Sequence, residues 1–107
     1  MNFDPDSWGP GLWRFLHCAT LSYPDNPTTD DMENMYSLFT SLESTLPCSE
    51  CRAHYSDHIL RSPLTVRILS SRRRLVRWLI DIHNEVNQTL GKPTLSYKKA
   101  IKIYLKE

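Results

Sequence analysis

Apolar residues recur every three or four positions along most of the chain, which is the spacing of one face of a helix. No run of alternating β-branched residues occurs, and the chain lacks the Asn-Gly and Asp-Gly turns of tight hairpins. The pattern therefore predicts an all-α protein. Its first helix ends near segment 23–27, and one face of that helix carries Trp13, Leu16, His17 and Thr20.

The second helix has signals at both ends. A hydroxyl at Thr28 or Thr29 can cap its free amides, and the acidic pair that follows favours the positive end of the helix dipole. Pro47 then breaks the helix. The apolar stripe between these signals consists of Met32, Met35, Phe39, Leu42 and Leu46.

Three more helices follow with short connections. The third begins at the cysteines of segment 48–51 and ends before Ser62. The fourth opens at residue 70 or 71 and runs to Leu90, with Gly91 placed to end it and a proline two positions later. The fifth is shorter and spans about 96–105. Helices joined by short loops predict a compact bundle.

The composition fits one globular domain that covers residues 1–107. Hydrophobic residues make up 40% of the chain and charged residues 23%, and a chain of this length can bury a core without disulfide staples. No apolar run approaches the ~20 residues of a membrane span, and the N-terminus lacks the basic and apolar regions of a secretory signal. We therefore expect a cytoplasmic protein with no membrane partner, in a compartment where ordinary thiols stay reduced.

Charge is divided between the two halves of the chain. Residues 1–60 carry nine acidic and two basic side chains, a net −7, and residues 61–107 carry eleven basic and three acidic ones, a net +8. Such polarity can steer an anionic ligand or orient two copies, and two solvated faces of opposite sign would also produce it. The basic residues do not indicate a nucleic-acid partner, because the net charge of the whole chain is only +1 and no recognised binding motif is present.

The segment LPCSEC, residues 46–51, carries the strongest chemical signal. Pro47 sets the chain for a helix start, so Cys48 falls at or near the N-terminus of the third helix. Residues i and i+3 on a helix are neighbours, which lets Cys48 and Cys51 form and break a disulfide with little backbone movement. The helix dipole also favours a thiolate, the nucleophile of disulfide exchange. The pair is thus predicted to be redox-active, with Cys48 the cysteine that partners reach.

Two other interpretations of the cysteines remain open. Cys48, Cys51, His54 and His58 have a spacing that suggests a zinc-stabilised helical binding module, although four ligands along one straight helix cannot easily surround a tetrahedral ion. Alternatively, the pair consists of inert core thiols. The third cysteine, Cys18, has no spaced partner, and we expect it to be a small buried side chain.

A second group of polar residues lies on the fourth helix. The apolar stripe of this helix consists of Leu75, Leu79, Ile82, Val86 and Leu90. His83 and Asn87 lie at the edge of this stripe, with Asn84 nearby and Trp78 one turn before. Hydrogen bonds between helices would satisfy any one of these polar groups. Together they are more typical of a slot for a flat polar molecule, with the first helix as its other wall, and a dithiol beside such a slot suggests a flavin.

Four motifs occur in order along the chain: GPGLWRFLH, YPDNPT, LPCSEC and HNEVNQTLGKP. Together they resemble the Erv/ALR family of FAD-linked sulfhydryl oxidases, especially the short members found in large DNA viruses, and the resemblance runs from Gly9 to Tyr104. It implies a four-helix bundle with a short fifth helix, FAD held within the bundle, and a homodimer. It also implies that thiol-containing protein substrates are oxidised to disulfides, that electrons pass through Cys48 and Cys51 to FAD, and that oxygen becomes hydrogen peroxide.

The resemblance also implies the roles of individual residues. Cys51 would be the cysteine that contacts the flavin, and Cys48 would be the one that exchanges with substrate thiols. No metal ligand is implied. The FAD-binding positions of the family fall on Gly9, Trp13, His17, Tyr23, Cys51, His54, His83, Asn84, Val86, Asn87, Lys92 and Tyr104.

Two features of many family members have no counterpart in this sequence. A second, structural disulfide is replaced by Leu60 and Tyr97, so we expect these two side chains to pack together. A cysteine-bearing tail that shuttles electrons is also missing. Cys48 is therefore expected to meet substrates directly or through a separate shuttle redox protein. A viral member of this kind would act in the host cytoplasm or in the virion.

Overall fold

The computed structural model describes residues 3–105, and within them the chain forms six helices and no strand. The prediction of an all-α protein is therefore confirmed. The helices are α1 (Pro5–Leu21), α2 (Thr29–Thr45), α3 (Ser49–Arg61), α4 (Val66–Leu69), α5 (Arg72–Thr89) and α6 (Tyr97–Leu105). None of these helices is both long enough and apolar enough to cross a membrane.

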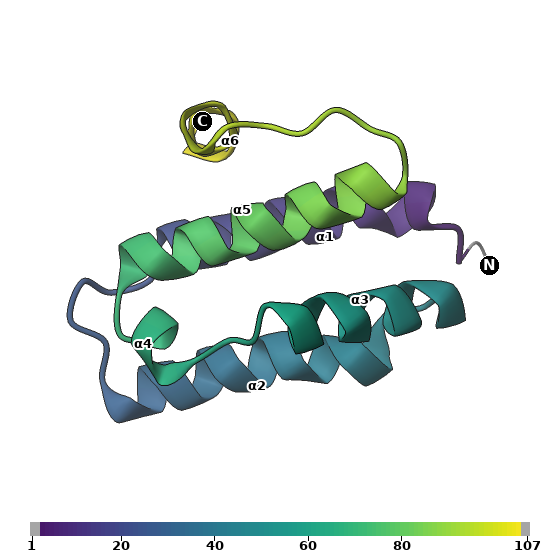
Figure 1. Ribbon diagram of the computed structural model, residues 1–107. Helices are drawn as coiled ribbons and strands as arrows, with labels where there is room; N and C mark the ends of the chain where they lie inside the picture. Colours follow the sequence, from purple (N-terminus) through teal and green to yellow (C-terminus); the bar gives the residue numbers. More distant parts are fainter. Residues whose placement is uncertain (1–2, 106–107) are drawn as a thin grey trace.

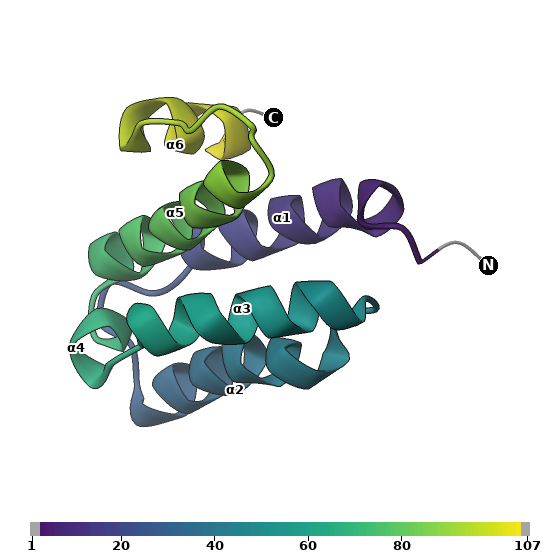
Figure 2. The ribbon, with the colours of Figure 1, turned by 45° about the vertical axis from the view of Figure 1, so that its right-hand side comes forward.

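The four long helices pack as two layers. In Figure 1, α1 and α5 lie side by side above a second pair formed by α2 and α3. The short helix α6 lies on the outer side of the α1–α5 layer, away from α2 and α3, and Figure 2 shows the same order from another side. The single-turn helix α4 sits at one end of the bundle, between α3 and α5 in the chain.

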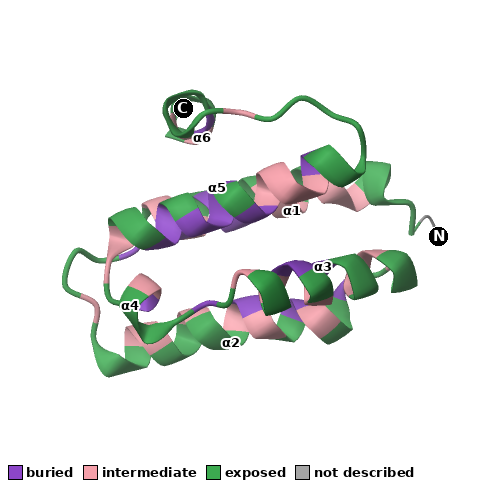
Figure 3. Cartoon of the chain, in the orientation of Figure 1, coloured by how far each residue is buried: buried purple, intermediate pink, exposed green. Residues whose placement is uncertain are grey.

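The core fills the space between the two layers. Figure 3 shows that the buried positions of the long helices face the opposite layer. Phe39 of α2 and Trp78 of α5 meet there edge to face, with ring centroids 5.0 Å apart. The indole N–H of Trp78 donates to the carbonyl of Ser62 at 2.9 Å, so this ring belongs to the core and not to a ligand slot. Fully burying a large apolar side chain contributes roughly 1.5–3 kcal/mol, so the side chains packed between the layers stabilise the bundle.

The predicted helix boundaries agree closely with the observed ones because local hydrogen bonds set them. At the start of α2, the amide of Asp31 donates to the Thr28 hydroxyl at 3.1 Å, and the amide of Thr28 donates back to the Asp31 carboxylate at 2.8 Å. This reciprocal pair satisfies two of the amides that a helix start leaves open. After α5, Gly91 adopts a φ of 70°, the left-handed conformation that glycine allows at a helix end.

The helices differ from the predicted ones at two points. The helix α4 was not predicted, since four residues are too few to show a periodic pattern. Its start is held by the Thr65 hydroxyl, which accepts from the Ile68 amide at 3.3 Å. The apolar stripe of α5 also ends earlier than predicted: Leu90 is the residue after the last turn, and its side chain is 58% exposed.

The expected contact between Leu60 and Tyr97 does not form. Leu60 lies on α3 and is 80% exposed. Tyr97 begins α6, on the far side of the α1–α5 layer, where its hydroxyl donates to the Asp81 carboxylate at 2.8 Å. The guanidinium of Arg77 covers its ring at 4.8 Å. Tyr97 therefore makes its contacts with Asp81 and Arg77 of α5, and Leu60 is largely exposed to solvent.

Cys18 is not a buried side chain as expected. It is exposed on α1, next to the buried His17, and its thiol lies 3.9 Å from the carbonyl oxygen of Tyr104 on α6. Successive residues on a helix point about 100° apart, so a residue beside the buried face can itself face outward.

Candidate functional site

One large cavity opens at an end of the bundle. The start of α1, the end of α2, the start of α3 and the end of α5 meet there and enclose about 650 Å³, a volume within the usual range for small-molecule sites. Buried side chains form its floor: Leu16, Leu42, Leu46, Tyr55, His58, Leu79 and Asn87. Exposed residues form its rim: Pro5, Asp6, Pro10, His54, Thr89, Leu90, Lys92 and Pro93. The floor is thus mostly apolar and the rim is more polar.

Stacked rings from three helices form one wall. The Trp13 and His83 rings are parallel within 6°, with their centroids 3.8 Å apart, and both line the cavity. Behind them, the buried His17 stacks on Tyr104 at 4.1 Å. The packing of α1 against α5 brings the first two rings together, and α6 supplies the tyrosine. Such a wall is flat, which suits contact with an aromatic ligand.

Both histidines of this wall are neutral at pH 7. Burial, and secondly the neighbouring His83, lowers the pKa of His17 from 6.5 to about 4. Burial, and secondly the positive charge of Lys92, lowers the pKa of His83 to about 4. Nε2 of His17 and Nδ1 of His83 are 2.8 Å apart, so one nitrogen donates a hydrogen bond and the other accepts it.

The two cysteines of segment 48–51 occupy different places. Cys48 is the N-cap of α3, as predicted, and its sulfur accepts a hydrogen bond from the amide of Cys51 at 3.2 Å. Cys51 lies one turn further along and lines the cavity, whereas Cys48 is outside its lining. Both side chains are partly exposed, and both are thiols in this structure.

The two thiols differ in pKa because their surroundings differ. Hydrogen bonds from the Cys51 thiol, and then from the Cys51 amide, lower the pKa of Cys48. Burial, and secondly the bond to Cys48, raises the pKa of the Cys51 thiol to about 11. Cys48 is therefore the first of the pair to ionise in the reduced protein, in agreement with its place at a helix N-terminus.

The structure gives no support to the zinc interpretation. Among the described residues 3–105, no group of three or more His, Cys, Asp or Glu side chains is placed to hold a metal ion. His54 is exposed at the cavity rim, and His58, one helical turn further along α3, is buried in its floor. Two histidines at this spacing can bind one ion, but four ligands along a single straight helix cannot surround it tetrahedrally.

Most of the residues predicted to bind FAD are brought together by the fold. Those that line the cavity are Gly9, Trp13, Cys51, His54, His83, Val86, Asn87, Lys92 and Tyr104. Three predicted residues are outside its lining. One of them, His17, supports the wall from behind through its contacts with His83 and Tyr104.

The other two residues outside the lining have structural partners. The hydroxyl of Tyr23 donates to the carbonyl of Leu69 at 2.7 Å and so ties the end of α1 to α4. The side chain of Asn84 uses both ends of its amide on Leu95: its NH₂ donates to the Leu95 carbonyl at 2.7 Å, and its oxygen accepts from the Leu95 amide at 2.9 Å. This pair of bonds holds the connection between α5 and α6.

Sequence reasoning missed part of the cavity wall. Tyr55 and His58 of α3 line the cavity together with Cys51. Their positions, four and seven residues after Cys51, share one helix face and were the available signal. The apolar floor residues of α1 and α2 gave no such signal, because a cavity wall and a core contact require the same residue types.

Comparison with known proteins identifies the family. The model of the Erv1 / Alr family matches residues 10–106. The chain belongs to the Erv1/Alr family. The family predicted from the four sequence motifs is therefore confirmed.

Relatives of this Erv1/Alr chain occur in large DNA viruses. A protein of Acanthamoeba polyphaga mimivirus, named a probable FAD-linked sulfhydryl oxidase, is 48% identical over 91% of this chain and 68% of its own length. An FAD-linked sulfhydryl oxidase of African swine fever virus is 30% identical over 91% of this chain and 79% of its own length. Among solved structures, the FAD binding domain of Erv1 from Saccharomyces cerevisiae is 28% identical, with a TM-score of 0.81 over 89% of this chain and 88% of that one.

Proposed function

We propose that this chain oxidises pairs of protein thiols to disulfides, with Cys48 and Cys51 as its redox-active pair, FAD in the cavity and oxygen as the final acceptor. Membership of the Erv1/Alr family makes the chain an FAD-linked sulfhydryl oxidase that acts on thiols. One observation carries the assignment of the pair: Cys51 lines the cavity, while Cys48, one turn away, lies outside its lining.

The residues of the cavity fit FAD. Its volume is about 650 Å³, its floor is apolar, and the stacked Trp13 and His83 offer a flat wall to a heterocycle. Lys92 at the rim supplies a positive charge for phosphate oxygens. Nε2 of His58 in the floor is buried with no hydrogen-bond partner among the described residues. Buried polar groups are normally hydrogen-bonded, so a bound ligand would supply the partner.

Thiol exchange at the pair proceeds in two steps. A substrate thiolate attacks the sulfur of Cys48 in the oxidised pair, the bond between Cys48 and Cys51 breaks, and Cys51 leaves on the cavity side. The second substrate thiolate then attacks the first substrate sulfur of the mixed disulfide and releases Cys48. The lowered pKa of Cys48 assists this release, because a thiol of lower pKa is a better leaving group.

The result is one substrate disulfide and one reduced pair, with two electrons transferred to the protein. FAD held in the cavity would supply the two-electron chemistry that links the reduced pair to oxygen, with hydrogen peroxide as the product. Cys51, which lines the cavity, would be the cysteine that contacts the cofactor. The neutral His83 would offer an uncharged ring to the cofactor.

The test combines cofactor analysis with cysteine variants. The purified protein should be yellow and release FAD on denaturation. Cys48→Ser and Cys51→Ser should each abolish oxygen uptake and peroxide formation with a reduced protein substrate, while both retain FAD. Cys18→Ser is the matched control and should keep nearly full activity, because Cys18 faces away from the cavity. A colourless protein, or normal turnover by Cys48→Ser, would overturn the proposal.

The assembly and place of action belong to the same proposal. The family resemblance supports a homodimer, and Phe15 of α1 and Tyr36 of α2 are exposed aromatic side chains that such an interface would cover. Similarity to viral relatives supports action in the host cytoplasm or the virion, on protein thiols or through a shuttle redox protein. Sedimentation equilibrium tests the homodimer. The place of action is tested by measuring the disulfides of virion proteins after loss of the gene.

A further inference from the structure

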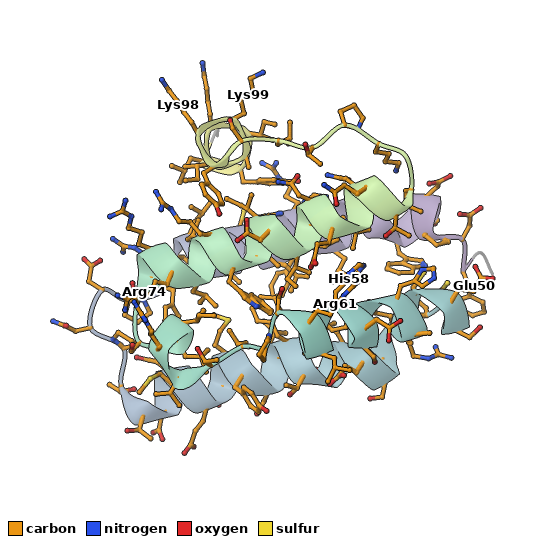
Figure 4. All side chains as sticks on the ribbon, in the orientation of Figure 1. Glu50, His58, Arg61, Arg74, Lys98 and Lys99 are labelled. Carbon is orange, nitrogen blue, oxygen red and sulfur yellow. The ribbon has the colours of Figure 1, made fainter. Side chains whose placement is uncertain are left out.

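His58 occupies an unusual place in the cavity. It lies on the face of α3 that carries Cys51, seven residues further along, which places it about 10 Å deeper by the rise of a helix. Its side chain is only 4% exposed, and Figure 4 shows it between α3 and α5. A polar side chain this deeply buried needs a hydrogen-bond partner for each of its polar atoms.

One ring nitrogen of His58 has a partner, and that partner sets the tautomer. Nη2 of Arg61 is 2.9 Å from Nδ1 of His58, and a guanidinium can only donate. Nδ1 must therefore present its lone pair to Arg61, and the ring proton must lie on Nε2. Oε2 of Glu85, which is also buried without a hydrogen-bond partner among the described residues, is 3.7 Å from the same Nδ1, beyond hydrogen-bond distance.

The other nitrogen is left as a buried donor. Nε2 has no partner among the residues that the structure describes. Burial, the largest effect, lowers the pKa of His58. The charged and titratable groups that face the ring are Glu85 of α5 and His54, Asp57 and Arg61 of α3. A neutral ring with its proton on Nε2 thus lines a cavity that fits a cofactor rich in oxygen and nitrogen acceptors.

We infer that the Nε2–H group of His58 donates a hydrogen bond to an acceptor atom of FAD at the inner end of the cavity, and that Arg61 is a positioning residue that holds the donating tautomer. The inference rests on the proposed binding of FAD in this cavity. It assigns to α3 a second contribution besides Cys51: a hydrogen bond that helps retain the cofactor. Leaving the FAD acceptor unpaired should weaken binding by roughly 10- to 100-fold.

The first experiment measures the FAD dissociation constant of apoprotein by flavin fluorescence. His58→Leu removes the donor and keeps an apolar side chain in the floor, so the dissociation constant should rise by about one to two powers of ten. His58→Gln retains an N–H donor and should recover most of the affinity. Thermal melts of the apoproteins serve as the fold control, and His58→Leu should melt close to wild type, because it removes an unsatisfied buried donor together with one hydrogen bond from Arg61.

The second experiment tests Arg61 against a matched residue. Arg61→Gln should raise the FAD dissociation constant several-fold, because Nδ1 can then take the proton. The same change in the His58→Leu background should have no further effect. Arg67→Gln removes one positive charge from an exposed position on α4 outside the cavity, and it should leave the affinity unchanged.

A spectroscopic measurement on wild-type protein keeps the test independent of protein stability. ¹⁵N-labelled histidine should show His58 as the Nε2–H tautomer in the apoprotein, with a shift of the Nε2–H signal when FAD is added. Failure of wild-type protein to bind FAD would overturn the proposed function itself. Normal FAD binding by wild type together with equal affinity in His58→Leu, or an Nδ1–H tautomer in the FAD complex, would overturn only the role of His58.

Discussion

His17 and His83 share a hydrogen bond of 2.8 Å between Nε2 and Nδ1, across the contact of α1 with α5. The bond requires at least one neutral ring, because two protonated imidazoles have only donors to offer. His83 is also the ring that stacks on Trp13 in the cavity wall. Protonation of this pair therefore affects both the packing of the bundle and the wall of the proposed FAD site.

Stability should fall as the pH drops from 6.5 to 4. Both rings have a folded-state pKa of about 4 against 6.5 in the unfolded chain, so between these values the unfolded chain binds protons that the folded chain does not. The stabilisation is complete above pH 6.5 and is lost as the pH falls toward 4, by about 3 kcal/mol for one ring. The two rings share one bond, so the loss for the pair is less than twice this value.

Urea unfolding of the apoprotein between pH 4 and pH 7.5 checks this expectation. In the His83→Gln variant, the free energy of unfolding should depend less on pH. In the His54→Gln variant, which changes an exposed histidine of the cavity rim, the pH dependence should be that of wild type. Equal slopes for wild type and His83→Gln over this range would contradict the assignment.

The two cysteines of the pair should differ in reactivity after reduction. Cys48 has a lowered pKa and Cys51 one raised to about 11, so iodoacetamide at pH 7 should modify Cys48 first. Peptide mass spectrometry of the reduced apoprotein at short reaction times measures the order. Cys48→Ser should leave Cys51 slow to react at pH 7. Faster modification of Cys51 than of Cys48 would reverse the proposed roles.

Asn84 is expected to act through the α5–α6 connection and not through direct contact with FAD. Asn84→Ala removes two hydrogen bonds to the backbone of Leu95 and should lower the free energy of unfolding by roughly 1–3 kcal/mol. Asn84→Asp keeps the acceptor for the Leu95 amide and should lose less. Chemical denaturation of the apoproteins measures both losses. Reduced FAD affinity in Asn84→Ala with unchanged apoprotein stability would show that Asn84 contacts the cofactor instead.

Bound FAD should stabilise the protein more than the cysteine pair does. A ligand at a hundredfold excess over its dissociation constant adds about 2.7 kcal/mol. A disulfide between Cys48 and Cys51 would close a very short loop and would constrain the unfolded chain little. Thermal melts should therefore show a large decrease in melting temperature when FAD is removed. The melting temperature should decrease only slightly when the protein is reduced with FAD in place.

The Leu60 position provides a control for this stability argument. Leu60→Ala should change stability by no more than about 0.5 kcal/mol, because the side chain is 80% exposed. If reduction lowered the melting temperature more than removal of FAD did, the protein would contain a structural disulfide, with Cys18 as a candidate partner.

The sequence by itself determined the features that depend on neighbours along the chain. The capping residues Thr28 and Ser71 mark their helix starts because their hydroxyls bond amides three residues away. Gly91 marks a helix end because it tolerates a positive φ. Cys48 and Cys51 could also be recognised as a pair at a helix start, because they lie only three residues apart and directly follow Pro47. The order of the motifs indicated the family, which the comparison confirmed.

The tertiary structure decided what depends on residues far apart in the chain. Asn84 and Tyr23 looked like cavity residues, but their hydrogen bonds go to Leu95 and Leu69, whose positions depend on how α4 and α6 pack. Cys18 proved to be exposed because α1 turns that side away from the bundle. The contact of His58 with Arg61 is local, since the two residues lie three positions apart on α3, but the burial of the His58 ring depends on the packing of α3 against α5. Helical periodicity shows which residues share a face, but the free energy of packing between helices determines what that face meets.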